Sequence, residues 1–216
     1  MPQFYLLKIK LLDMPHAIWR RFVVPSNITL DQLHEVVQIV MGWHNSHLHV
    51  FIKGNQQYMS AMSLELGDEN DSLLEDDYTL ESLAPKKGAK IRYCYDFGDD
   101  WLHEIVVENV NYEDPAQSHP IYCVAGEKAC PPEDCGGVYG YLDFCDAIAD
   151  PKHPEHRNLK EWFGGKYDPN HFDLDAVNKR LGVGHSPKKK ATKKAAKKTA
   201  KKKTKKSKPK RMWVRR

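Results

Sequence analysis

The amino-acid sequence predicts an α+β fold: a mixed or antiparallel sheet packed with about four helices and followed by a disordered basic tail. Segments whose apolar residues alternate, as they do in strands, dominate the first part of the chain. Segments with apolar residues three or four positions apart, as in helices, dominate the second part. The tail follows from composition, because the last 31 residues carry 17 of the 33 Lys and Arg and no Asp or Glu.

Three alternating segments predict strands over residues 4–12, 18–24 and 47–53. The inward faces that this alternation predicts for the first and third strands are Tyr5, Leu7, Ile9 and Leu11, and then Leu48, Val50 and Ile52. Between the second and third strands, residues 29–41 have the apolar spacing of a helix. Thr29 has the position of the first residue of a capping box, completed by the glutamine three positions on.

The clearest hairpin lies in the middle of the chain, after an acidic stretch over residues 54–78 that predicts an irregular surface excursion and a short helical turn at 79–83. Gly98 and Asp99 are typical turn residues between two alternating strands. The predicted inward faces of these strands are Ile91, Tyr93, Tyr95 and Phe97, and Trp101, His103, Ile105 and Val107.

Helices are expected after a loop at residues 119–137 that carries prolines and cysteines. The first helix is predicted by an apolar stripe of Tyr141, Leu142, Cys145 and Ile148. A second helix over 154–162 begins with proline, which suits a first helical turn, and Gly164 ends it. A third is capped by Asp173 and ends before Gly182.

Charge divides the chain into a single predicted domain, residues 1–184, and a tail, residues 185–216. The tail's 17 basic residues leave 16 basic against 29 acidic residues in the rest, a formal charge of −13. The two parts therefore have opposite electrostatic character.

The sequence favours a cytoplasmic protein, associated with the nucleoid if the source is bacterial, and no membrane partner. No apolar stretch approaches the length that spans a bilayer, and the first residues lack the pattern of a signal peptide. In that compartment cysteines are expected as thiols or metal ligands rather than disulfides.

Three motifs in a fixed order resemble one known family. They are Tyr95-Asp96-Phe97-Gly98-Asp99-Asp100-Trp101-Leu102-His103-Glu104-Ile105, then Ala129-Cys130-Pro131-Pro132-Glu133-Asp134-Cys135-Gly136-Gly137 with Gly140-Tyr141, and Tyr167-Asp168-Pro169 with Phe172-Asp173. This combination resembles the Ri-plasmid ORF-three-like family, also labelled as TnpR-like passenger proteins of insertion elements, from residue 3 to residue 182. The resemblance implies an α+β fold with a mixed sheet and an association with mobile elements, and it implies no particular activity.

Resolvase chemistry, which the TnpR-like label suggests, finds no support in the residues. A serine recombinase needs a nucleophilic serine beside clustered arginines. The folded part has dispersed arginines among acidic residues: Arg20, Arg21, Arg92, Arg157 and Arg180. The basic tail lies outside the family pattern and resembles the C-terminal domains of linker histones.

We expect no cofactor, and zinc is the alternative that the sequence leaves open. His47 and His49 are two residues apart on a predicted strand, and Cys130 and Cys135 lie in one loop. His103 is a fifth candidate ligand, and zinc would accept any four of these five side chains. The competing interpretation is a core histidine at 103 and two histidines on the polar face of a sheet.

Polar residues of the first two motifs predict a concave site at one end of the sheet, where the hairpin and the proline-rich loop meet. Its candidate residues are Asp96, Asp100, His103, Glu104, Glu133, Asp134 and Cys135. They are suited either to a cation or acid–base site or to ordinary turns and caps. No residue is assigned a catalytic role.

The tail predicts nonspecific binding to DNA or RNA, because its cations neutralise phosphates without reading bases. The residues expected to do this are Lys188, Lys189, Lys190, Lys193, Lys194, Lys197, Lys198, Lys201, Lys202, Lys203, Lys205, Lys206, Lys208, Lys210, Arg211, Arg215 and Arg216. The alternative is a solubilising tail. An anionic-membrane anchor is disfavoured, since apolar residues are scarce before position 212.

These observations together predict a nucleic-acid-associated, non-enzymatic protein whose acidic body binds a protein, a peptide or a small ligand. The alternative is an enzyme, such as a metal-assisted hydrolase at the Asp/Glu/His/Cys cluster, which the tail localises to nucleic acid. A structural adaptor in which the tail matters little is a third hypothesis.

Overall fold

The computed structural model describes residues 3–66, 71–115 and 119–183. The predicted tail and its boundary after residue 184 lie outside these residues, so the division into domain and tail stays a prediction. No helix among the described residues is long and apolar enough to span a membrane.

A single sheet of eight strands organises the fold in the order β5-β4-β3-β6-β7-β1-β2-β8. The strands are β1 (Phe4–Leu11), β2 (Trp19–Pro25), β3 (His49–Lys53), β4 (Gln56–Met59), β5 (Leu73–Leu74), β6 (Lys90–Tyr95), β7 (Trp101–Asn109) and β8 (Tyr122–Glu127). Neighbouring strands are antiparallel except β4 and β5, which are parallel. The predicted α+β fold with a mixed sheet is therefore confirmed.

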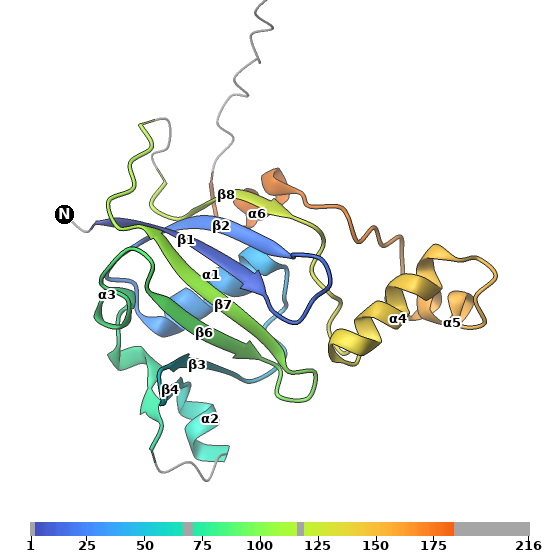
Figure 1. Ribbon diagram of the computed structural model, residues 1–216, viewed down its shortest axis with the longest axis horizontal. Coiled ribbons are helices and arrows are strands. Elements are labelled where there is room, and N and C mark those ends of the chain that lie inside the picture. The colour runs from blue at the N-terminus through green and yellow to red at the C-terminus, as the bar shows by residue number, and fades with distance from the viewer. Residues whose placement is uncertain (1–2, 67–70, 116–118, 184–216) are drawn as a thin grey trace, which may run out of the picture. The chain divides into compact units, whose positions relative to one another are not determined.

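Six α-helices and one 3₁₀-helix accompany the sheet among the described residues, where the sequence predicted about four helices. They are α1 (Leu30–Met41), α2 (Ala61–Leu66), α3 (Leu80–Leu83), α4 (Gly137–Ala149), α5 (His156–Phe163) and α6 (Leu174–Arg180), with the 3₁₀-helix at Glu75–Asp77. Helix α1 covers one face of the central strands, whereas α4 and α5 lie beside the sheet as a pair (Figure 1).

The core forms between α1 and the face of the sheet that it covers. The predicted inward residues of β1 are all at most 2% exposed, and the apolar stripe of α1 packs against them. Burying one such side chain contributes roughly 1.5–3 kcal/mol. In the hairpin of β6 and β7 the predicted faces are also buried, except Phe97, which is 47% exposed because β6 ends at Tyr95.

Four local expectations are wrong. Thr29 precedes α1, but its side chain bonds the Asp31 carboxylate instead of a helix N–H group, so the capping box does not form. The excursion at 54–78 contains β4, α2 and β5, and the loop at 119–137 contains β8, which pairs with β2. The inward face of β3 is also inverted: His49 and Phe51 belong with the main core, whereas Val50 packs in a separate small cluster.

Candidate functional site

The turn between β6 and β7 meets the loop before α4. The backbone N–H of Gly136 donates to Asp99 Oδ2 at 3.1 Å. A Cβ on Gly137, whose φ is +67°, would stand 2.7 Å from the Asp99 carbonyl oxygen, so only glycine permits this approach. The paired glycines that open α4 thus hold the two loops together.

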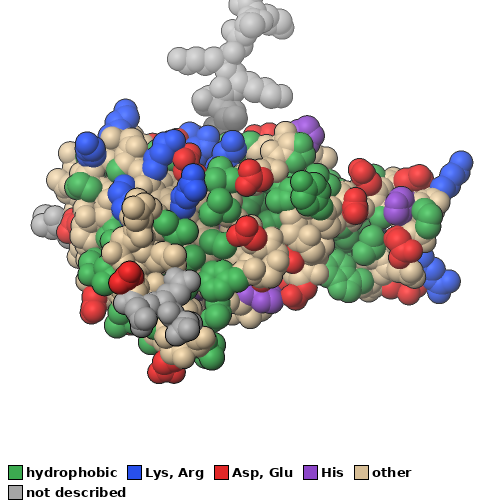
Figure 2. All heavy atoms as spheres, turned by 60° about the horizontal axis from the view of Figure 1, so that its bottom comes forward, with side chains coloured by type: hydrophobic (Ala, Val, Ile, Leu, Met, Phe, Trp, Pro, Cys, Tyr) green, Lys and Arg blue, Asp and Glu red, His purple; other side chains and the backbone are tan. Residues whose placement is uncertain are grey.

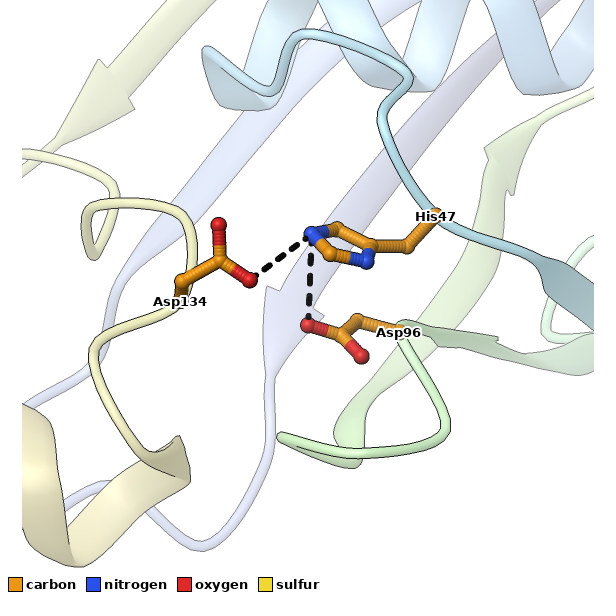
Figure 3. A group of neighbouring side chains, drawn as sticks. All are labelled: His47, Asp96 and Asp134. Atoms are coloured by element: carbon orange, nitrogen blue, oxygen red, sulfur yellow. Dashed lines mark ion pairs between the residues drawn. The ribbon is translucent and has the colours of Figure 1, made fainter.

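This junction surrounds the imidazole of His47 with carboxylates. Its Nε2 atom lies 3.2 Å from Asp134 Oδ1, 3.7 Å from Asp96 Oδ2 and 3.8 Å from Glu133 Oε2. Figure 3 shows the His47 ring between Asp96 and Asp134, which come from different loops. His47 itself lies in the segment between α1 and β3. Three segments distant in the sequence therefore converge on one nitrogen atom.

Each of the two least exposed carboxylates uses one oxygen to anchor itself. Glu133 Oε1 accepts from the backbone N–H of His44 at 2.7 Å and from the Tyr95 hydroxyl at 3.1 Å. Burial raises the pKa of Tyr95, so its phenol keeps the proton that it donates. Asp96 Oδ1 accepts from the backbone N–H of Gly98 at 2.9 Å. The second oxygen of each carboxylate is left for His47.

The backbone conformation at positions 96 and 134 explains why aspartate occupies them. Asp96 and Asp134 have φ angles of +60° and +57°, in the left-handed region. Aspartate tolerates this region better than most residues, because its short polar side chain can hydrogen-bond the adjacent backbone. The motif residues are therefore turn formers that also present carboxylates.

The other candidate residues make different contacts. His103 is fully buried in the core, where its Nδ1 atom lies 3.2 Å from the Tyr93 carbonyl oxygen, and burial lowers its pKa to about 4. Glu104 pairs with Lys90 at 3.0 Å. Asp100 accepts from the Cys94 thiol at 3.2 Å, and burial raises the pKa of Cys135 to about 12. His103 and Glu104 therefore do not belong to the shared polar site. They lie within β7, on its two opposite faces, and not in the turn that precedes it.

The structure does not bring together the candidate zinc ligands His47, His49, Cys130 and Cys135. Among the described residues, the group of three or more potential ligands within 4.8 Å of one another is His47, Asp96 and Asp134. His49 instead pairs with Glu75 at 2.8 Å, both almost fully buried. Burial raises the pKa of Cys130, which keeps its thiol protonated.

A second polar group lies next to His47, and sequence reasoning missed its member His34. The rings of His34 and His49 stack 3.5 Å apart and, with His47, line a cavity of about 530 Å³ that also includes Asn45 and Glu75. His34 lies on the inward face of α1, four residues after Leu30, so helical periodicity could have identified it as buried.

Hydrogen bonds indicate which ring nitrogen of His34 carries the proton. Gln38 Nε2 donates to the Tyr93 hydroxyl at 2.9 Å, which leaves that hydroxyl to donate to His34 Nδ1 at 2.8 Å. His34 Nε2–H then donates to Asn45 Oδ1 at 2.8 Å. Burial, and secondly the neighbouring His49, lowers the pKa of His34 to about 3. His34 is therefore neutral at physiological pH.

The fold and site together define a class: a single-sheet α+β protein with a histidine–carboxylate cluster where two motif loops meet. Its family follows from comparison, since the model of the plasmid pRiA4b ORF-3-like protein family matches residues 3–176. The chain belongs to this family, which confirms the resemblance seen in its motifs.

One relative is similar in sequence and another in fold, and both are described as proteins of unknown function or uncharacterized. The uncharacterized protein y4hQ of Sinorhizobium fredii is 38% identical over 180 residues, which are 81% of this chain and 89% of that protein. The crystal structure of the protein of unknown function MM3350 from Methanosarcina mazei Go1 superposes with a TM-score of 0.70 at 30% identity. That match covers 82% of this chain and 97% of MM3350.

Proposed function

We propose that the protein associates with nucleic acid through its tail and that its folded unit serves as a binding module for a protein or small ligand. The observation that carries the proposal is the charge separation: 17 basic and no acidic residues in the last 31, against a formal charge of −13 before them. A segment of this composition binds phosphates and releases their counterions, whatever the base sequence.

The folded unit offers less to a polyanion. On the face seen in Figure 2, Lys and Arg lie at the upper left and again at the right-hand end, and Asp and Glu lie among or beside them in both places. Several of the basic side chains are also paired, as Arg21 is with Glu108 and Lys90 with Glu104. These pairs support the tail as the nucleic-acid-binding part.

Removal of the tail tests the proposal. The full-length chain is expected to bind random duplex DNA at least about a hundredfold more tightly than a chain that ends at Gly184. Binding is measured by fluorescence anisotropy at low salt, with single-stranded RNA in parallel to distinguish the two nucleic acids.

A chain with the tail residues in scrambled order is the matched control, since its charge and length are unchanged. It should bind as the natural chain does. Equal binding by the full-length and truncated chains would refute nucleic-acid association through the tail.

A second candidate function is metal-assisted hydrolysis beside the His47 cluster, and it requires metal binding there. The specific observation that favours it is that His47 lies in both the carboxylate cluster and the wall of the 530 Å³ cavity, so that a cation and a substrate would be adjacent. A bound divalent cation would supply Lewis acidity to a substrate in that cavity.

Hydrolysis of labelled single-stranded DNA and of a small phosphodiester in the presence of Mn²⁺ tests this candidate. Hydrolysis is expected for the natural chain and for His16→Gln, which alters an exposed histidine, but not for His47→Gln. Activity that survives His47→Gln would eliminate this site as the catalytic centre.

A further inference from the structure

We propose that His47, Asp96, Glu133 and Asp134 bind a divalent transition-metal ion, with Mn²⁺ and Zn²⁺ as the preferred ions. This site differs in three of its four ligands from the histidine–cysteine set that the sequence suggested. It does not depend on the tail, so metal binding and nucleic-acid association can fail independently.

Two unsatisfied atoms point to a ligand at this place. His47 Nε2 and Glu133 Oε2 are both shielded from solvent and have no hydrogen-bond partner among the described residues. Although three carboxylate oxygens lie within 3.8 Å of Nε2, none of them makes a hydrogen bond with it. Buried polar atoms are normally paired, and a cation between them would satisfy both atoms at once.

The distances fit such a cation. Ligands bound about 2.1 Å from a metal ion lie roughly 3.0–3.4 Å from one another in octahedral or tetrahedral geometry. The three distances from Nε2 are 3.2, 3.7 and 3.8 Å. His47, Asp96 and Asp134 offer ligand atoms that all lie within 4.8 Å of one another, so small rotations bring these three to an ion. Glu133 is outside that group and has to move farther to complete the shell.

The surroundings resemble those of a metal site as well. Glu133 is oriented by Tyr95 and by the backbone of His44 through one oxygen, and Asp96 by the backbone of Gly98. Outer hydrogen bonds of this kind orient metal ligands in proteins. Asp134, with a side chain 69% exposed, faces solvent and gives an ion a route of entry.

The donor set determines the kind of ion. Imidazole nitrogen suits Zn²⁺ and other transition metals, whereas carboxylate oxygen also suits Mn²⁺. Mg²⁺ and Ca²⁺ prefer oxygen ligands alone, so His47 disfavours them. The site has no thiolate, and Mn²⁺ therefore distinguishes it from the cysteines elsewhere in the chain.

The competing arrangement is a protonated His47 that forms ion pairs with the same carboxylates. It predicts no saturable metal binding. A metal ion and a proton would compete for Nε2, so metal affinity should fall as the pH is lowered.

Metal titration of the full-length chain, stripped with chelator, tests the proposal. Isothermal calorimetry with Zn²⁺ and electron paramagnetic resonance with Mn²⁺ should each show one saturable ion per chain. Asp134→Asn keeps a residue type that tolerates the left-handed backbone of this exposed position, and it should weaken the affinity about tenfold to a hundredfold. Asp143→Asn, an exposed carboxylate on α4, is the matched control and should leave affinity unchanged.

Pulsed resonance of the bound Mn²⁺ provides a readout that a purely structural role would not change. It should show coupling to an imidazole nitrogen, and His47→Gln should remove that coupling. Absence of saturable binding, or equal affinity in the natural chain and Asp134→Asn, would overturn the proposal.

Discussion

DNA binding by the full-length chain is expected to weaken roughly thirty-thousandfold when the salt concentration rises from about 50 mM to about 200 mM. The cause is the release of counterions from DNA when tail cations neutralise phosphates. If about half of the 17 basic residues engage phosphates, the logarithm of the affinity falls with that of the salt concentration with a slope of about −7 to −8.

Shortening the tail provides an internal control for this slope. A chain that ends at Ala200 retains seven lysines of the tail, so it should show roughly half the slope of the full-length chain. Binding is measured by anisotropy in a salt series with one random duplex. A full-length slope near −2 would mean that few tail cations contact phosphates at the same time, contrary to the proposed mode of binding.

The sequence predicted the fold best where one periodicity acts over a long segment. Tyr5, Leu7, Ile9 and Leu11 alternate without interruption, and all four are buried. The prediction failed where a polar residue is buried by pairing. His49 enters the core because its imidazole pairs with the buried carboxyl of Glu75, and periodicity then assigns the wrong face to β3. It also missed β4, β5 and β8, which lie toward the sheet edges, where apolar alternation is weakest.

The candidate site was partly predictable for a related reason. Asp96, Glu133 and Asp134 stand in two motifs dense in polar residues, and the structure brings these motifs together. The nitrogen at the centre, His47 Nε2, belongs to a third segment that no motif marks as part of the same site. The alternation of residues along β7 places His103 on the same face as Trp101 and Ile105. The structure confirms that His103 is in the core, and this position excludes it from the site.

Acid is expected to destabilise the folded unit through the two buried neutral histidines. Burial lowers the pKa of His34 to about 3 and that of His103 to about 4, from 6.5. Below pH 6.5 the unfolded chain therefore binds protons that the folded chain does not, and stability falls as the pH falls. Each histidine contributes about 1.4 kcal/mol per pH unit in this range, so the two together cost on the order of 5 kcal/mol by about pH 4.5.

That loss is a large part of the roughly 5–15 kcal/mol that stabilises a typical domain. The free energy of unfolding, measured by urea titration with tryptophan fluorescence, should therefore fall clearly between about pH 7 and pH 4.5. His34→Gln keeps a side chain that can bond Tyr93 or Asn45 but removes one titrating group. It should lower stability at pH 7 and roughly halve the histidine-dependent part of the pH slope.

The matched control for this experiment is His16→Gln, which changes an exposed histidine. It should leave both the stability at pH 7 and the pH slope close to those of the natural chain, because His16 is exposed and lies outside the buried core. Carboxylates that titrate in the same range affect all three chains alike and cancel in the comparison. If His34→Gln keeps the full slope, the proton is taken up elsewhere, and the stacked pair of His34 and His49 does not control the acid sensitivity of the fold.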